Sequence, residues 1–344
     1  MAVTIKEVAA LAGVSPSTVS RTCKDHPSIS RETKEKVRYA MAQLGYEPNL
    51  SSAAAASQAS QLIGIILPPS IKDVYENAFY LETIRGISQF CNGREYISTL
   101  VTGQDDKEIL RAIQILVKDE RFGGFILLYS RVNDPIIDYL YENGILYVLI
   151  GKAKQFANQT IYIDNDNLLA GQEATEYLYS LGHRKIAYVG SEYSLLFSAE
   201  RKAGYQMALA KHDLPFVPEY CIEVEQTSLD CVEQFGALLE RPERPTAIVA
   251  SDDILATALN RICVKQGFSV PEDLSIVSFN NSLFARISLP QLTSVDVNSL
   301  QLGIEAASQL INHIENPNLL ATKIIVPHSL IVRGSCRKLS EGEN

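Results

Sequence analysis

The spacing of apolar residues changes along the chain, from helical at its start to alternating strand and helix from residue 62 onward. The first apolar stripe has the i, i+3, i+4, i+7 spacing of one helix face and consists of Ile5, Val8, Ala9 and Ala12. Thr4 and Glu7 form a capping-box pattern before this stripe, and Gly13 is placed to end the helix. The pattern therefore predicts a short helix that begins after Thr4.

Two more helices are predicted before residue 50. Ser15 is an expected N-cap, and Pro16 then falls at the first helical position, where its missing N–H costs nothing. Ser30 is expected to cap a third helix that Gly45 ends, with an apolar face made by Val37, Ala40, Met41 and Leu44. A helix, a short glycine turn and a second capped helix make a helix-turn-helix, so we expect a three-helix head over residues 1–49.

From residue 62, β-branched apolar runs alternate with helical patterns. We expect strands at 62–68, 96–101, 124–129, 145–150, 160–163, 185–190, 247–251 and 275–279, and later ones at 292–297, 323–326 and 329–333. We expect helices near 79–90, 106–118, 135–142, 167–181, 199–212, 253–266 and 299–315. This βαβ series predicts an α/β fold with buried, mostly parallel sheets, arranged as two successive doubly wound halves.

Charge and composition narrow the class of protein. The chain of 344 residues carries a net charge of -9, but residues 1–50 hold seven Lys or Arg against five Asp or Glu. A mildly basic head on an acidic body fits a modular DNA-binding protein. The six cysteines lack metal-like spacing, the start does not resemble a signal peptide, and the apolar runs are too short to span a bilayer. We therefore expect a cytoplasmic protein with free thiols.

Catalytic and metal-binding patterns are missing from the sequence. The five histidines lie far apart, and no H-E-x-x-H, G-x-S-x-G, P-loop or G-x-G-x-x-G run occurs. We therefore expect neither an enzyme nor a resident metal or cofactor.

The runs VTIKEVAALAGVSPSTVSR at 3–21 and SRETKEKVRYAMAQLGYEPN at 30–49 resemble the DNA-binding head of the LacI/GalR family of bacterial transcription regulators. PQLTSVD at 290–296 and LIVRGS at 330–335 are similar to later signatures of that family. The resemblance thus extends over essentially the whole chain.

The resemblance implies a periplasmic-binding-protein-like core of two discontinuous subdomains behind the head. The expected parts are a head at 1–49, a hinge at 50–61, a first subdomain at 62–163 plus 291–321, a second at 164–290 plus 322–337, and a tail at 338–344. Ligands of open α/β sheets bind at the carboxyl ends of strands, so the cleft between the subdomains is the expected effector site.

The resemblance also implies a set of DNA contacts, with Arg21 as the side chain that reads guanine and Pro16 and Ser17 adjusting specificity. The full predicted set is Thr4, Ser15, Pro16, Ser17, Thr18, Ser20, Arg21, Lys24, Ser30, Thr33, Asn49 and Ala55. In the family a hinge helix inserts leucines into the minor groove. Here alanines stand at 53–56, in place of the family's Arg and wedge Leu, so the sequence leaves open whether this hinge kinks the duplex.

The resemblance further implies effector contacts at Phe79, Tyr80, Arg201, Asp252 and Asn280, and Lys152 follows the end of a strand from which it could reach the cleft. Aromatic faces stack on the C–H faces of sugars, and the forked guanidinium of Arg suits vicinal hydroxyls. The alternatives are that the two aromatic residues only pack the first core helix and that Arg201 is a surface side chain in an ion pair. Asp253 is expected only to cap a helix, and the D-N-D-N run at 164–167 fits a helix cap better than a metal site.

Together these patterns predict a homodimeric, sugar-responsive repressor that binds a pseudo-palindromic operator in double-stranded DNA, with no membrane partner. The runs D-N-D-N and F-I-L-L-Y-S-R-x-N-D-P are similar to those of maltose-operon repressors of Gram-positive bacteria, which favours maltose or a maltodextrin as effector. The alternatives are a regulator that responds to another sugar or to a phosphocarrier protein, and a sugar-binding module with weakened DNA binding.

Overall fold

A computed structural model describes residues 5–14, 18–19, 22, 30–46, 61–69, 77–191, 194–224 and 230–340. The chain divides into two compact units, Met1–Ser60 and Gln61–Asn344, which we call the head and the core.

The head shows two of the predicted helices in full, α1 (Ile5–Ala12) and α3 (Arg31–Leu44). Ser30 caps α3 by accepting a hydrogen bond from the Thr33 N–H, and Gly45 ends it at φ +60°. The buried residues of the head are Val8, Ala9, Val19, Val37 and Ala40. The predicted apolar face of α3 is therefore confirmed, as are the positions of Val8, Ala9 and Ala12 in that of α1. Thr18, Val19 and Thr22 are helical, and the rest of the predicted second helix lies outside the described residues.

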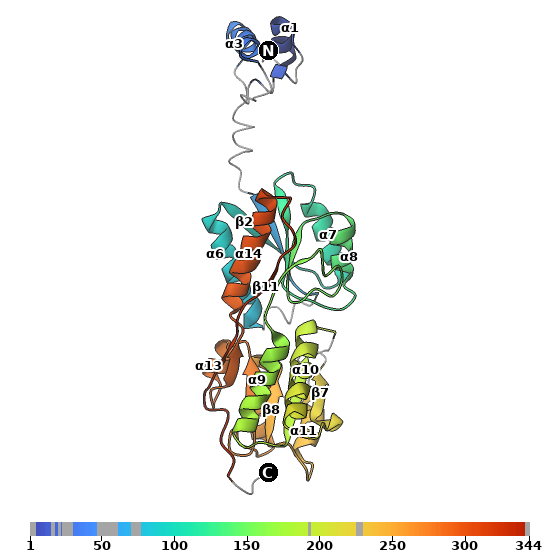
Figure 1. Ribbon diagram of the computed structural model, residues 1–344, viewed down its shortest axis with the longest axis vertical. Helices are drawn as coiled ribbons and strands as arrows, with labels where there is room; N and C mark the ends of the chain where they lie inside the picture. The colour runs from blue at the N-terminus through green and yellow to red at the C-terminus, as the bar shows by residue number, and fades with distance from the viewer. Residues whose placement is uncertain are drawn as a thin grey trace. The chain divides into compact units, whose positions relative to one another are not determined.

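The core contains two lobes, each with a six-stranded sheet covered by helices on both faces (Figure 1). In the first lobe the strand order is β2-β1-β3-β4-β5-β11, and every pairing is parallel. Its strands are β1 (Gln61–Ile66), β2 (Tyr96–Val101), β3 (Phe122–Leu127), β4 (Tyr147–Ile150), β5 (Ile161–Asp164) and β11 (Lys323–Ile325). Helices α6 (Ala78–Gly93) and α14 (Ser299–Glu315) cover one face, and α7 (Asp106–Leu116) and α8 (Pro135–Glu142) cover the other.

The second lobe repeats this plan with the order β7-β6-β8-β9-β10-β12, in which only β12 is antiparallel to its neighbour. Its strands are β6 (Ile186–Ser191), β7 (Cys221–Val224), β8 (Ala247–Ala250), β9 (Ser275–Phe279), β10 (Thr293–Asp296) and β12 (Ser329–Ile331). Its helices are α9 (Asn167–Ser180), α10 (Leu196–Lys211), α11 (Asp230–Leu239), α12 (Asp253–Lys265) and α13 (Leu283–Ile287). The predicted fold class is confirmed, although the sequence patterns had not indicated β7, α11 or α13.

The chain crosses between the lobes three times, and two of these crossings lie later than predicted. The first lies between β5 and α9, close to the expected residue 163. The crossings expected near 291 and 321 are wrong, because β10 pairs with β9 in the second lobe and β11 pairs with β5 in the first. An apolar run shows that a strand is buried, but not which sheet it joins.

In each lobe two helices cross on glycine residues. A Cβ at Gly303 of α14 would lie 2.1 Å from the Thr83 carbonyl oxygen of α6, and one at Gly204 of α10 would lie 2.0 Å from that of Leu168 in α9. Only glycine permits such close approach of two helix backbones. This close helix packing fixes the positions of α6 and α10, whose first turns carry side chains of the candidate site.

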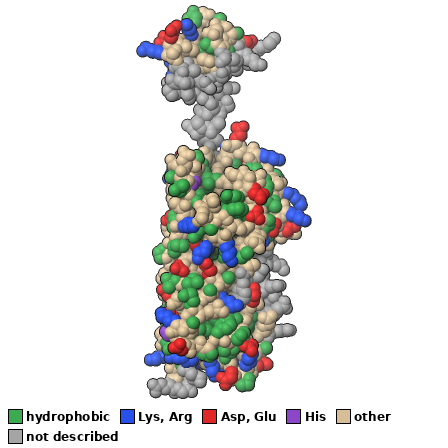
Figure 2. Space-filling model, turned by 45° about the vertical axis from the view of Figure 1, so that its right-hand side comes forward, with side chains coloured by type: hydrophobic (Ala, Val, Ile, Leu, Met, Phe, Trp, Pro, Cys, Tyr) green, Lys and Arg blue, Asp and Glu red, His purple; other side chains and the backbone are tan. Residues whose placement is uncertain are grey.

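The surface of the core has no dominant charge on the face shown in Figure 2. Acidic and basic side chains are interspersed there among hydrophobic ones. Within the described ranges, no helix is both long enough and apolar enough to cross a membrane.

Candidate ligand cavity and DNA-binding head

A cavity with about 620 Å³ of empty space lies between the two lobes. It is lined at the carboxyl ends of strands from both sheets, by Asp164 at the end of β5, by Asp252 after β8 and by Asn280 after β9. The position is the one expected for a ligand of two facing α/β sheets.

The structure brings most of the predicted effector residues together and excludes one. Phe79, Tyr80, Arg201, Asp252 and Asn280 all line the cavity.

Lys152, which was also predicted to reach the effector, is not among the lining residues. Its Nζ lies 2.6 Å from Oε1 of Glu200 on α10, and the two side chains form an ion pair between the lobes. The acidic partner on the opposite lobe, which is remote in sequence, holds the lysine away from the cavity.

The aromatic side of the cavity is built at the start of α6. Asn77 caps this helix, since its Oδ1 accepts a hydrogen bond from the Phe79 N–H at 3.0 Å. The rings of Phe79 and Tyr80 meet edge to face with centroids 5.5 Å apart. Both rings also pack against the buried cluster of the first lobe, so they serve the fold and the cavity together.

Arg201 supplies a buried positive charge on the second lobe, in the helix α10. Its Nε donates to Oδ1 of Asn167 at 2.9 Å and its Nη1 donates to the carbonyl oxygen of Ser251 at 2.6 Å. The guanidinium carbon lies 4.2 Å from the ring centroid of Phe279 and 5.0 Å from that of Phe197. Burial lowers the pKa of Arg201 to about 10, and the alternative of a surface ion pair is wrong because the residue is only 4% exposed.

Asp252 takes both of the roles that the sequence had divided between Asp252 and Asp253. Asp252 both lines the cavity and caps α12, accepting a hydrogen bond from the Leu255 N–H at 2.8 Å. Asp253 is buried in a polar network, where it accepts from the hydroxyls of Ser278 and Ser294 at 2.6 and 2.7 Å. The expectation that Asp253 is only a cap is therefore wrong, because its carboxylate joins β9 and β10.

Asn280 and Asn281 both have positive φ, at +96° and +47°. Asparagine tolerates this left-handed conformation better than most residues. The turn presents the neutral amide of Asn280 to the cavity, while the Asn281 amide donates to Oδ2 of Asp296 at 2.9 Å.

Several cavity residues were not predicted from the sequence, and three of them lie in the D-N-D-N run. Asp166 caps α9 as predicted, accepting from the Leu169 N–H at 3.0 Å. Asp164, Asn165 and Asn167, however, line the cavity, as does Phe197. The available signal was position, because Asp164 directly ends a buried strand at the carboxyl edge of the sheet.

Asn165 ties the three crossing segments together. Its amide nitrogen donates to the carbonyl oxygens of Val297 and Val326 at 3.0 and 2.9 Å. These two residues belong to the second and third crossings, so one side chain links all three connections between the lobes.

Among the described residues, no group of three or more His, Cys, Asp or Glu side chains is placed to hold a metal ion.

The described part of the head contains three of the predicted DNA contacts. Thr18 is helical, and the hydroxyls of Ser30 and Thr33 lie 2.8 Å apart at the start of α3. The other predicted contacts lie outside the described residues: Thr4, Ser15, Pro16, Ser17, Ser20, Arg21, Lys24, Asn49 and Ala55.

Known proteins match both units of the chain. Residues 4–49 match the family described as bacterial regulatory proteins, lacI family, and residues 175–336 match a periplasmic binding protein-like domain. The chain is 34% identical over 335 residues to the HTH-type transcriptional regulator MalR of Streptococcus pneumoniae, covering 96% of this chain and 99% of that protein.

Two solved structures with the same fold are of regulators named for sugars. A complex of the transcriptional regulator CelR with cellobiose is 28% identical, with a TM-score of 0.75, and covers 97% of this chain and 99% of that chain. A probable maltose operon transcriptional repressor, malR, from Staphylococcus is 25% identical, with a TM-score of 0.73, and covers 80% of this chain and 97% of that chain.

Proposed function

The chain belongs to the lacI family of bacterial regulatory proteins, and we propose that maltose or a maltodextrin is the effector that controls it. It is a sugar-responsive transcriptional repressor rather than an enzyme, and it binds operator DNA as a dimer. Effector binding in the cavity then changes the affinity of the dimer for its operator, which is a coupling between two sites.

The observation that carries the sugar proposal is the pairing of aromatic rings with a buried guanidinium across one cavity. Phe79 and Tyr80 offer ring faces and edges on the first lobe, and Arg201 and Asn280 offer hydrogen-bonding groups on the second. Sugars present both an apolar C–H face and a ring of hydroxyls, so they use both kinds of contact. The neutral amide of Asn280 favours an uncharged ligand.

The choice of maltose is supported by the similarity to MalR and to the probable maltose operon repressor. The similarity to CelR bound to cellobiose favours a second candidate, a β-linked disaccharide. Calorimetric titration of the full chain with maltose, maltotriose, cellobiose, sucrose and ribose separates these candidates. We expect heat with maltose and maltotriose, whereas heat with cellobiose or ribose alone would reject the maltose proposal.

For the DNA contacts, we propose that Arg21 reads one guanine in each half-site. Replacing Arg21 by Ala is expected to weaken operator binding by about 1–3 kcal/mol and to relax specificity at one base position. Arg31 is a matched control, since it lies on the exposed surface of α3 in an ion pair with Glu35 at 3.1 Å. Gel shifts on an operator and its single-base variants test this, and unchanged base selectivity in Arg21→Ala would reject the assignment.

The same gel shift tests the alternative of a sugar-binding module with weakened DNA binding. That alternative rests on the alanines at 53–56, which lie outside the described residues. Failure of the wild-type protein to retard any operator fragment, with sugar binding intact, would favour it. A pull-down with a phosphocarrier protein tests the remaining alternative.

We also propose where the two subunits meet. Strand β2 is an edge of the first sheet, and it carries Ile97 and Leu100 with 53% and 52% of their surfaces exposed. Leu81 on the neighbouring helix α6 is 57% exposed. Exposed apolar side chains beside a sheet edge mark a surface that a partner covers. Ile97→Asp combined with Leu100→Asp is expected to give monomers in analytical ultracentrifugation and to abolish operator retardation.

A further inference from the structure

Two polar atoms of the cavity residues are buried without a hydrogen bond among the described residues, the hydroxyl oxygen of Tyr129 and one carboxyl oxygen of Asp164. Oδ2 of Asp164 has no partner among the described residues, although Asp164 as a whole is only 5% exposed. The other carboxyl oxygen, Oδ1, accepts a hydrogen bond from the Asn167 amide at 3.1 Å. Leaving a buried polar atom unsatisfied costs about 1–3 kcal/mol. An atom of this kind in a ligand cavity indicates a partner that arrives with the ligand.

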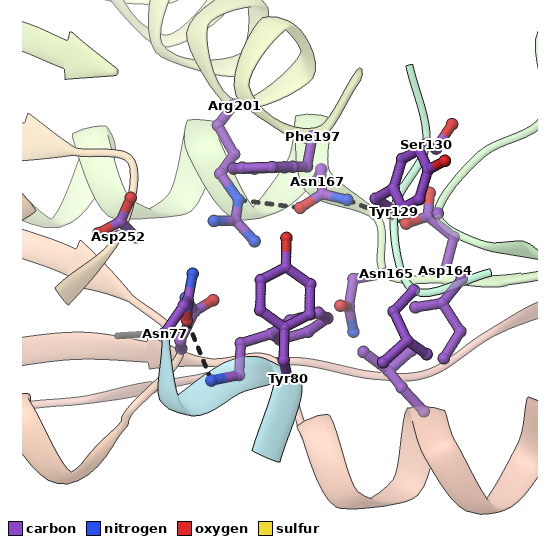
Figure 3. A pocket seen from close by; sticks show the side chains of 16 residues that line it. Asn77, Tyr80, Tyr129, Ser130, Asp164, Asn165, Asn167, Phe197, Arg201 and Asp252 are labelled. Atoms are coloured by element: carbon purple, nitrogen blue, oxygen red, sulfur yellow. Dashed lines mark hydrogen bonds between the residues drawn. The ribbon is translucent and has the colours of Figure 1, made fainter. Parts of the chain in front are cut away.

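Asp164 is also connected to the residue that carries the positive charge of the cavity. Asn167 donates from its amide nitrogen to Asp164 and accepts, at its amide oxygen, from Nε of Arg201 at 2.9 Å (Figure 3). Arg201 in turn donates to the carbonyl oxygen of Ser251, at the end of β8. The carboxyl at the end of the first sheet is therefore linked through hydrogen bonds to the second sheet.

The groups that face Asp164 set the balance between its two protonation states. Burial and the negative charge of Glu200 on α10 raise the pKa of Asp164 to about 7. The positive charges of Lys152, which follows β4, and of Arg201 on α10 act in the opposite direction. In the empty cavity at neutral pH, protonated and ionised Asp164 are thus both populated.

Building on the proposed saccharide effector, we infer that Asp164 contacts the effector directly: a sugar hydroxyl donates a hydrogen bond to Oδ2, and effector binding releases a proton from this carboxyl to solvent. A carboxylate that gains a hydrogen-bond donor favours its ionised form, so ligand and proton compete for the same oxygen. The sugar thereby satisfies the one cavity carboxyl oxygen that the described residues leave unpaired. Effector affinity then depends on pH near neutrality.

The experiment is calorimetric titration of the full-length protein with maltose at pH 6, 7 and 8, in two buffers of different ionisation enthalpy. Affinity is expected to rise about tenfold from pH 6 to pH 8, with about half a proton released at pH 7. Asp164→Asn keeps the shape of the side chain and removes the titration, so its weaker binding is expected to be independent of pH and buffer. Asp166→Asn, which alters only the α9 cap, is the control and keeps the wild-type pH dependence.

Two results overturn the inference: no proton release by the wild-type protein on binding, or the same pH dependence in Asp164→Asn. A second arm uses no sugar and records carbon-13 NMR spectra of the aspartate carboxyls in the empty protein between pH 3 and pH 9. One carboxyl is expected to titrate near neutral pH and to be missing in Asp164→Asn. Absence of heat with maltose rejects the proposed effector. The NMR arm then still decides on Asp164, because titration of every aspartate in the ordinary acidic range overturns the inference.

Discussion

The two lobes of the core share one plan but face the cavity with different chemistry. Their sheets have equivalent strand orders, β2-β1-β3-β4-β5-β11 and β7-β6-β8-β9-β10-β12. In each lobe, glycine residues let two helices pack closely against each other. At the cavity, the first lobe contributes mainly apolar and aromatic side chains such as Phe79 and Tyr80. The second lobe contributes Arg201, Asp252 and Asn280.

This difference shows which level of structure decides function. The shared backbone plan fixes only where a ligand can bind, at the carboxyl ends of two facing sheets. The residue that follows each strand fixes what binds there, and these residues differ between the lobes. Asp164 ends β5, directly before the chain passes from the first lobe to the second. It therefore lies where the mainly apolar lining of the first lobe adjoins the polar lining of the second.

The largest predicted effect tests the shared plan. Gly204→Ala and Gly303→Ala each force a Cβ to within about 2 Å of a backbone oxygen, so both are expected to lower the free energy of unfolding by about 2–3 kcal/mol. Chemical denaturation measures this. Gly93→Ala, where a Cβ meets nothing within 4 Å, is the control and is expected to leave stability unchanged or slightly raised. If only one of the two glycine substitutions lowered stability, the helix pairs of the two lobes would not be packed equivalently.

The next prediction tests the charged and polar side chains that the second lobe contributes to the cavity. Arg201→Met keeps apolar contact with the rings of Phe197 and Phe279 but removes the donors, so effector affinity is expected to fall roughly 10- to 100-fold. Calorimetric titration measures the loss. Lys202→Met, on the same helix but absent from the cavity lining, is the matched control. Equal losses in both variants would show that charge on α10 acts without direct contact.

A smaller effect concerns the stability of the empty protein. The folded pKa of Asp164, about 7, is raised above its ordinary value of 3.8, so its stabilising contribution is complete at acid pH and is lost as pH rises through 7. Between pH 6 and pH 8, the free energy of unfolding of the wild type is expected to fall by about 1.4 kcal/mol relative to Asp164→Asn. Urea denaturation of both proteins measures the difference, and parallel curves would contradict it.

The smallest effect is expected for Lys152, which is not among the residues that line the cavity. The Lys152–Glu200 ion pair joins the lobes, but Lys152 is 44% exposed, so Lys152→Met is expected to change stability by less than about 1 kcal/mol. Effector affinity at neutral pH is expected to fall by less than about threefold, since Lys152 only helps to keep Asp164 ionised. A loss of effector affinity as large as that of Arg201→Met would indicate that Lys152 contacts the effector.

Local signals allowed much of this molecule to be predicted. Helices α1 and α3 were predicted from the spacing of their apolar residues. The caps at Ser30 and Asp166 were predicted from residues within one helical turn. The cavity residues Phe79 and Arg201 were predicted through the resemblance of their segments to those of the family. The errors involve long-range pairing, since the sheet that β10 or β11 joins depends on partners far away in sequence. The ion pair of Lys152 was not predicted for the same reason, because its partner Glu200 lies on the other lobe.

The path of the chain also constrains the order in which the protein can fold during its synthesis. The first lobe begins at Gln61, yet α14, which packs on α6, ends at Glu315 and β11 ends at Ile325. A nascent chain that has emerged only as far as residue 298 therefore exposes the face of α6 on which α14 packs. The first lobe cannot be completed until the second lobe has been almost entirely made, so its apolar surface stays uncovered while the second lobe is synthesised.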